Sequence, residues 1–170
     1  MDLSVVFPVF NEEENVPILL EEITRALAGE PWSYEIIAVD DGSRDRSLEV
    51  LRAARAKYPS LRVITFEKNS GQTAALDAGW RAARGDFVVS LDADLQNDPA
   101  DIPRMMTKRE ELGVDMIIGV RVNRHDTWSR RMQSKIGNGV RNWITRDKIT
   151  DTGKRFKLPG HPASMRAGPQ

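Results

Sequence analysis

The sequence predicts an α/β fold, in which helices cover both faces of a mostly parallel sheet. Short apolar runs alternate with segments whose apolar residues recur at helical spacing. The connections between them are short, as in repeated strand–helix–strand units. The apolar, β-branched run at 87–91 is typical of a buried parallel strand. A length of 170 residues is enough for one domain with its own core.

The first half of this pattern contains two strands and one long helix. A strand at 3–7 is expected to end at Pro8, because proline has no backbone N–H to donate. Asn15 is expected to cap the following helix, with Pro17 in its first turn. The apolar stripe of this helix is Val16, Leu19, Leu20, Ile23 and Leu27. A second strand is expected at 35–39.

The second half continues the alternation. Asp45 is expected to cap a helix running to about Lys57, followed by a strand at 61–66. The Ala-rich segment 71–83 predicts a helix that packs closely on the sheet. After the strand at 87–91, Asp98 and Pro99 resemble an N-cap and a first helical residue. A fifth strand is expected at 116–120.

Composition excludes several classes of protein. The formal net charge is zero, which gives no sign of nucleic-acid binding. There is no cysteine, so disulfides and thiolate metal sites are excluded. No apolar run is long enough to span a bilayer, and no signal peptide is evident. We expect a cytoplasmic chain, or one peripheral to the membrane.

An acidic pair follows the strand at 87–91. Asp92 and Asp94 leave its carboxyl end, where open α/β sheets bind ligands. Together with the Gln96 amide they suit a hard divalent cation that also holds phosphate oxygens. The alternative is an acidic turn that caps the next helix.

A second acidic pair, Asp40 and Asp41, follows the strand at 35–39. It suits a nucleobase better than a metal, because Asp40 can accept hydrogen bonds from the ring N–H groups of uracil or guanine. Phe10, after the first strand, can pack against the base. The alternative is that Asp41, Gly42 and Ser43 form only a turn. Three such strand ends on one edge favour a single site.

Other α/β enzymes fit less well. No GxGxxG follows a strand and no GxxxxGK[ST] is present, which disfavours dinucleotide and P-loop sites. A phosphoaspartyl phosphatase would need its acidic pair after the first strand. A receiver domain would leave Asp92 and Asp94 unexplained. His125 and His161 are too isolated to serve a nucleophile.

These blocks resemble the family 2 glycosyltransferases with a Rossmann-like GT-A fold. The matching blocks are Phe7-Pro8-Val9-Phe10-Asn11-Glu12, Val39-Asp40-Asp41-Gly42-Ser43, Asn69-Ser70-Gly71-Gln72 and Leu91-Asp92-Ala93-Asp94-Leu95-Gln96. Residues 119–124 and 126–128 make the chain most similar to the polyprenyl-phosphate glycosyltransferases, including dolichol-phosphate mannosyltransferase and bacterial undecaprenyl-phosphate enzymes of the cell envelope.

The resemblance implies a role for each matching residue. Nucleotide binding would use Pro8, Phe10, Glu12, Asp40 and Asp41, and the ligands of Mg²⁺ or Mn²⁺ would be Asp92, Asp94 and Gln96. Asp92, Asp94 and Arg121 would form the catalytic group. Arg121 would contact a phosphate, and Arg130 and Arg131 would contact the lipid-phosphate acceptor or the membrane surface. For Arg130 and Arg131 a solvated basic helix face is the alternative.

The implied reaction moves a sugar, with inversion, from a UDP- or GDP-linked donor to polyprenyl phosphate. A lipid phosphate needs no general base, because the second pKa of a phosphate monoester is about 6. A sugar hydroxyl acceptor would need a carboxylate after Gly153, and the sequence has none there. This favours the phosphate acceptor.

The family pattern is lost after Gly153. We expect a glycosyltransferase domain over 1–153, incomplete at its C-terminus, and a disordered tail over 154–170, which is rich in proline, glycine and basic residues. A frameshifted or truncated reading frame would explain the change. The alternative function is then a non-catalytic nucleotide-sugar-binding remnant of such an enzyme.

Overall fold

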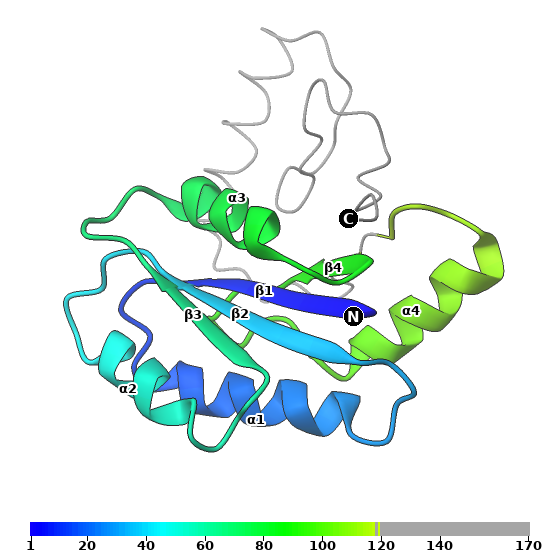
Figure 1. Cartoon of the computed structure of the whole chain (residues 1–170), viewed down its shortest axis with the longest axis horizontal. Coiled ribbons are helices and arrows are strands. Elements are labelled where there is room, and N and C mark those ends of the chain that lie inside the picture. Colours follow the sequence, from blue (N-terminus) through cyan, green and yellow to red (C-terminus); the bar gives the residue numbers. More distant parts are fainter. Residues whose placement is uncertain (118, 120–170) are drawn as a thin grey trace, which may run out of the picture. The chain divides into compact units, whose positions relative to one another are not determined.

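The computed structural model describes residues 1–117 and 119, in which strands and helices alternate (Figure 1). The strands are β1 (Leu3–Val9), β2 (Tyr34–Asp40), β3 (Leu61–Thr65) and β4 (Phe87–Ser90). The helices are α1 (Asn15–Leu27), α2 (Ser47–Ala54), α3 (Gln72–Ala82) and α4 (Asp101–Leu112). The predicted α/β class is confirmed.

The four strands form one sheet in the order β3-β2-β1-β4, and every pair is parallel. In this register Val6 lies opposite both Ile37 and Ser90. The chain adds β2 and β3 on one side of β1 and β4 on the other. The strand order therefore reverses between β1 and β4, which is the place where open α/β sheets bind ligands.

Helices cover both faces of the sheet, and each face has its own apolar cluster (Figure 1). The larger cluster joins β1 and β2 to α1, α2 and α4. Its α1 members are the predicted stripe of Val16, Leu19, Leu20, Ile23 and Leu27, all of them buried. The smaller cluster joins Val6, Ile37 and Val39 to Ala75 and Leu76 of α3.

Helix α3 lies close against the sheet, as its alanine content predicts. A Cβ added at Gly79 would overlap Cγ1 of Val6 and lie 3.2 Å from Cγ2 of Val39. Only a residue without a side chain allows this approach. The small residues of α3 thus set the position of its N-terminus, which enters the site described below.

Strand β1 runs past Pro8 to Val9, so the predicted end at Pro8 is wrong. The carbonyl of Val6 accepts from Leu91 N–H and that of Asp2 from Phe87 N–H, so even-numbered residues of β1 direct their backbone groups toward β4. The last residue that β1 pairs with β4 is Val6. Proline at position 8 therefore removes no ladder bond among the described residues.

Three helix starts also differ from the predictions. Asn15 is the first residue of α1 rather than its cap, and its side-chain amide donates to Glu12 Oε2 at 2.6 Å. Asp45 accepts from Ser47 N–H at 2.9 Å, but α2 begins only at Ser47. Asp98 likewise accepts from Ala100 N–H, so that a turn precedes α4. Helix α1 thus begins one residue earlier than predicted, whereas at α2 and α4 the aspartate bonds to a nearby backbone N–H and the helix begins later.

Two other expectations need correction. Strand β4 is not fully buried: Phe87 and Val89 pack on the core while Val88 and Ser90 are exposed, because β4 is an edge strand in the described part of the chain. The strand expected at 116–120 is not formed at its described residues 116, 117 and 119, and Met116 is 66% exposed. Helix α2 ends at Ala54 rather than Lys57, since the chain tightens into turns there.

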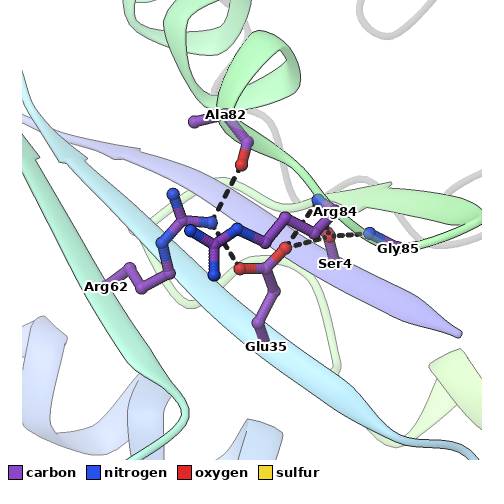
Figure 2. Close-up of polar contacts among 6 residues, drawn as sticks. All are labelled: Ser4, Glu35, Arg62, Ala82, Arg84 and Gly85. Carbon is purple, nitrogen blue, oxygen red and sulfur yellow. Dashed lines mark hydrogen bonds and ion pairs between the residues drawn. The ribbon is translucent and has the colours of Figure 1, made fainter. Parts of the chain in front are cut away.

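A buried polar network fixes the connection between α3 and β4 (Figure 2). The Glu35 carboxylate accepts from Ser4 Oγ at 2.7 Å, from Arg84 N–H at 2.7 Å and from Arg62 at 2.5 Å. Ser4 Oγ in turn accepts from Gly85 N–H at 2.9 Å. The network joins β1, β2 and β3 to the residues that lead into β4.

The network also determines the charge state of Glu35. Burial by itself raises the pKa of this carboxyl group, but the hydrogen bonds from Arg62, Ser4 and Arg84 outweigh it, and the pKa of Glu35 is lowered. The ionised form is therefore the one that the fold stabilises.

No helix within residues 1–117 is long and apolar enough to cross a bilayer. The expected domain limit at residue 153 and the expected tail at 154–170 lie outside the described residues, and both stay predictions.

Candidate nucleotide and metal site

The predicted site residues within the described part of the chain follow β1, β2 and β4. Since all strands of the sheet are parallel, their carboxyl ends meet at one edge. The loops after β1 and β4 flank the point where the strand order reverses. The sheet therefore brings these three segments together, as the sequence predicts.

Asp40, the last residue of β2, is 1% exposed, and only one of its two carboxylate oxygens accepts a hydrogen bond from the described residues. Its Oδ2 accepts from Thr65 Oγ1 at 3.2 Å, whereas its buried Oδ1 has no hydrogen-bond partner among the described residues. Buried acceptors are nearly always paired, and those left over need an explanation. An N–H donor of a bound ligand would satisfy this oxygen.

Asp41 is 3% exposed, and both of its oxygens are occupied. Oδ1 accepts from Ser70 N–H at 2.7 Å and Oδ2 from Gly71 N–H at 2.9 Å. The adjacent Gly42 has φ +68°, and a Cβ there would lie 2.6 Å from the backbone of Lys68 and Asn69. Asp41 and Gly42 thus hold the loop after β3 against the loop after β2.

The loop after β1 is bonded to the segment between β2 and α2. Asn11 has φ +57°, its N–H donates to Ser43 Oγ at 3.0 Å, and its Oδ1 accepts from Arg44 N–H at 2.8 Å. Glu12 N–H donates to Ser47 Oγ at 2.8 Å. These bonds fix the backbone that directly follows Phe10.

Three predicted nucleotide contacts lie at the end of β1 and in the loop after it. Phe10 is 40% exposed, and Pro8 is half-buried in β1. The Glu12 carboxylate accepts from Asn15 and lines a shallow acidic hollow. The hollow is lined by Asn11, Glu12, Glu13, Glu14, Asn15 and Asp45. Phe10 is therefore free to pack against a planar ligand, whereas Glu12 already has a partner.

The acidic pair after β4 lies where the chain leaves the strand and enters a turn at Ala93 and Asp94. Leu91 and Ala93 are buried, whereas Asp92 is half-buried and Asp94 exposed. The chain then turns at Leu95, which has φ +58°.

Hydrogen bonds hold both carboxylates. Asp92 Oδ1 accepts from Gln72 Nε2 at 2.9 Å, and Asp92 Oδ2 accepts from Asn97 Nδ2 at a longer 3.4 Å. Asp94 Oδ1 accepts from Gln96 N–H at 3.1 Å. A carboxylate with defined donors is oriented before any cation binds.

The oxygen donors at this turn fit a divalent cation. Asp92, Asp94 and the exposed side-chain amide of Gln96 offer the hard ligands that Mg²⁺ and Mn²⁺ prefer. Within the described residues no group of three or more Asp, Glu, His or Cys side chains could hold a metal. Magnesium commonly needs only one or two carboxylates when phosphates complete its coordination.

Several residues that shape the site carry no prediction from sequence. Gln72, Asn97 and Thr65 each donate to one of the predicted acidic residues. The Gln72 position stands in a block that matches the family, yet its partner is 20 residues away in the chain. Arg121, Arg130 and Arg131 lie outside the described residues, and their roles stay predictions.

Comparison with known proteins identifies relatives among the glycosyltransferases. The sequence model of Glycosyl transferase family 2 matches residues 4–169. The undecaprenyl-phosphate 4-deoxy-4-formamido-L-arabinose transferase of Serratia proteamaculans is 45% identical over 153 residues, which is 89% of this chain and 46% of that protein. The dodecaprenyl-phosphate galacturonate synthase of Rhizobium johnstonii is 39% identical over 160 residues, or 93% and 47%. The chain thus spans slightly less than half the length of either relative.

Solved structures with this fold include two glycosyltransferase complexes. S. aureus TarS 1-349 in complex with UDP-GlcNAc has a TM-score of 0.57 at 26% identity, over 75% of this chain and 37% of that one. The mannosyltransferase PcManGT from Pyrobaculum calidifontis, in complex with GDP-Man and Mn²⁺, has a TM-score of 0.51 at 25% identity, over 58% and 29%. These likenesses agree with the predicted GT-A fold.

Proposed function

Because the chain belongs to glycosyl transferase family 2, we propose that it binds a nucleoside-diphosphate sugar and transfers the sugar to polyprenyl phosphate. The observation that carries the proposal is the buried Oδ1 of Asp40, which lacks a partner among the described residues and lies at the same sheet edge as Asp92 and Asp94. Asp40 suits a nucleobase, and Asp92 with Asp94 suits a cation bound to a diphosphate.

In this proposal the nucleoside lies at the ends of β1 and β2. Asp40 Oδ1 accepts a ring N–H of uracil or guanine, and the exposed Phe10 packs against the base. Asp41 contributes by holding the loop after β3, since its own oxygens are bonded to that loop. The complexes of TarS with UDP-GlcNAc and of PcManGT with GDP-Man support either base.

The diphosphate lies beside the turn after β4. A divalent cation held by Asp92, Asp94 and Gln96 would supply Lewis-acid neutralisation of the charge on the leaving diphosphate. The complex of PcManGT with Mn²⁺ supports this choice of ion. Gln72 and Asn97 keep the Asp92 carboxylate in place during the reaction.

The transfer is a single displacement at the anomeric carbon. A phosphate oxygen of the lipid forms the new bond, the bond to the diphosphate oxygen breaks, and its electron pair leaves with the nucleoside diphosphate. One such displacement inverts the configuration. The acceptor oxygen is already ionised near neutral pH, because the second pKa of a phosphate monoester is about 6, so no residue has to remove a proton.

The names of the relatives support polyprenyl phosphate as the acceptor. Both curated relatives carry a polyprenyl phosphate in their names. In the proposal Arg121, Arg130 and Arg131 contact the acceptor phosphate at the cytoplasmic surface of a membrane.

The test is transfer of radiolabelled sugar from UDP- and GDP-sugars to undecaprenyl phosphate in detergent with Mn²⁺. We expect label in the lipid phase with one donor, and none with Asp94→Ala. Nucleotide-sugar binding without any transfer by the intact chain would contradict the catalytic proposal and favour a binding remnant.

A further inference from the structure

The N-terminus of α3 lies between the two halves of the proposed site. Ser70 and Gly71 donate their N–H groups to the two oxygens of Asp41, directly after β2. The next residue, Gln72, begins α3 and donates its side-chain amide to Asp92, directly after β4. Three consecutive residues thus connect the end of β2 to the end of β4.

The bond from Gln72 to Asp92 is made by the side-chain amide of Gln72. The Nε2–Oδ1 distance of 2.9 Å is that of a well-formed hydrogen bond. Gln72 itself is exposed and occupies the first turn of α3, where its side chain buries no apolar surface of the core. Its side chain therefore contributes little to the fold beyond this bond.

Contacts around the start of α3 fix the backbone that carries the Gln72 side chain. Asp41 is buried and its two bonds to Ser70 and Gly71 are 2.7 and 2.9 Å long. Gly79 fixes the depth of the helix against β1 and β2. The backbone of Gln72 is thus held by the bonds just before the helix and by the close packing at Gly79, and its amide donates to Asp92 without a ligand present.

We infer that Gln72 is a positioning residue that orients the Asp92 carboxylate for the divalent cation. The inference rests on the proposed function, because it assumes that Asp92 is a ligand. A carboxylate oxygen has two lone pairs, so Oδ1 can accept from Gln72 and still bind a metal. Donors to metal-ligating carboxylates typically change metal affinity by about 10- to 100-fold when they are removed.

The test compares Gln72→Met with Thr73→Ala in the full chain. Methionine keeps an unbranched side chain of similar length and good helix propensity but has no amide donor. Thr73 is exposed in the same turn and serves as the matched control. Mn²⁺ affinity is read from the EPR signal of free Mn²⁺ in the presence of UDP or GDP, and nucleotide affinity without metal is measured by calorimetry.

We expect Gln72→Met to weaken Mn²⁺ binding by about 10-fold or more, with unchanged metal-free nucleotide affinity and melting temperature. Thr73→Ala should match the unaltered chain in all three measurements. Equal Mn²⁺ affinity in Gln72→Met would overturn the inference while leaving the proposed site intact. A parallel loss of metal-free nucleotide binding would also overturn it, because the role would then be structural. Absence of Mn²⁺ binding in the unaltered chain would instead remove the cation site itself.

Discussion

Two neighbouring carboxylates at the end of β2 have opposite surroundings. Both are buried, but Asp41 accepts two backbone N–H groups whereas Asp40 has an oxygen without a partner in the described residues. A buried acceptor without a partner costs about 1–3 kcal/mol of stability. Within the described residues the fold therefore keeps a cost at Asp40, and an N–H donor of a bound ligand would offset it.

This contrast predicts opposite effects of two amide substitutions. Asp40→Asn removes a buried charge that is poorly satisfied, so the melting temperature of the unliganded chain should rise. The same change should weaken UDP or GDP binding by about 10- to 100-fold, since a hydrogen bond to a charged group contributes about 1.5–3 kcal/mol. Differential scanning fluorimetry and calorimetry measure the two quantities.

Asp41→Asn is the matched comparison. Its new amide group would face the N–H of Ser70 or Gly71, and the free energy of unfolding should fall by about 1–3 kcal/mol. If Asp40→Asn lowered the melting temperature as much as Asp41→Asn, the Asp40 oxygen without a partner would not destabilise the unliganded chain, and this explanation would be wrong.

At the scale of elements, the connection into β4 is fixed at its start by Glu35 and its partners (Figure 2). Arg62 also donates to the carbonyl of Ala82 at the end of α3 at 2.9 Å. Strand β4 is short and half-exposed, so its position depends on this network at one end and on its pairing with β1. The network lies at the amino end of β4, and the acidic turn follows the other end.

The network gives the fold a pH dependence with a definite sign. The pKa of Glu35 is lowered below its ordinary value of 4.5 in the folded chain. Its stabilisation is therefore complete above pH 4.5 and is lost as the pH falls through the lower, folded-state pKa. Glu35→Gln should be less stable than the unaltered chain at pH 7 by about 2–3 kcal/mol, less than for a fully buried pair because Arg62 is partly exposed.

Urea denaturation from pH 7 to pH 3 measures this difference. The stability gap between Glu35→Gln and the unaltered chain should narrow below pH 4.5. A gap that stayed constant to pH 3 would show that the charge of Glu35 is not what stabilises the network.

For the whole molecule, periodicity in the sequence predicts the layers well. The stripe of α1 and the alanine-rich face of α3 depend only on local spacing, and both are where the sequence places them. Pro8 was a misleading signal, because its effect depends on whether β4 extends far enough to need its N–H. The exposure of β4 likewise depends on its neighbours in the sheet.

The sequence predicts which strand ends form the site, but it does not predict most of the hydrogen bonds within the site. Which edge the acidic residues share follows from parallel strands alone. The partners of Asp41, and Gln72 as a partner of Asp92, lie 20–30 residues away in the chain, at and just before the start of α3. A short polar block such as Asn69–Gln72 has no periodicity to reveal its role. Long-range hydrogen bonds of this kind appear only once the chain is folded.

In the proposed function, the carboxyl ends of β1 and β4 bind a divalent cation together with a nucleoside diphosphate. Anomalous diffraction from crystals soaked with Mn²⁺ and the preferred nucleotide would locate this cation. We expect one strong peak in contact with carboxylate oxygens of Asp92 or Asp94 and with the diphosphate. A cation bound elsewhere, with nucleotide present and no density beside either carboxylate, would contradict the proposal.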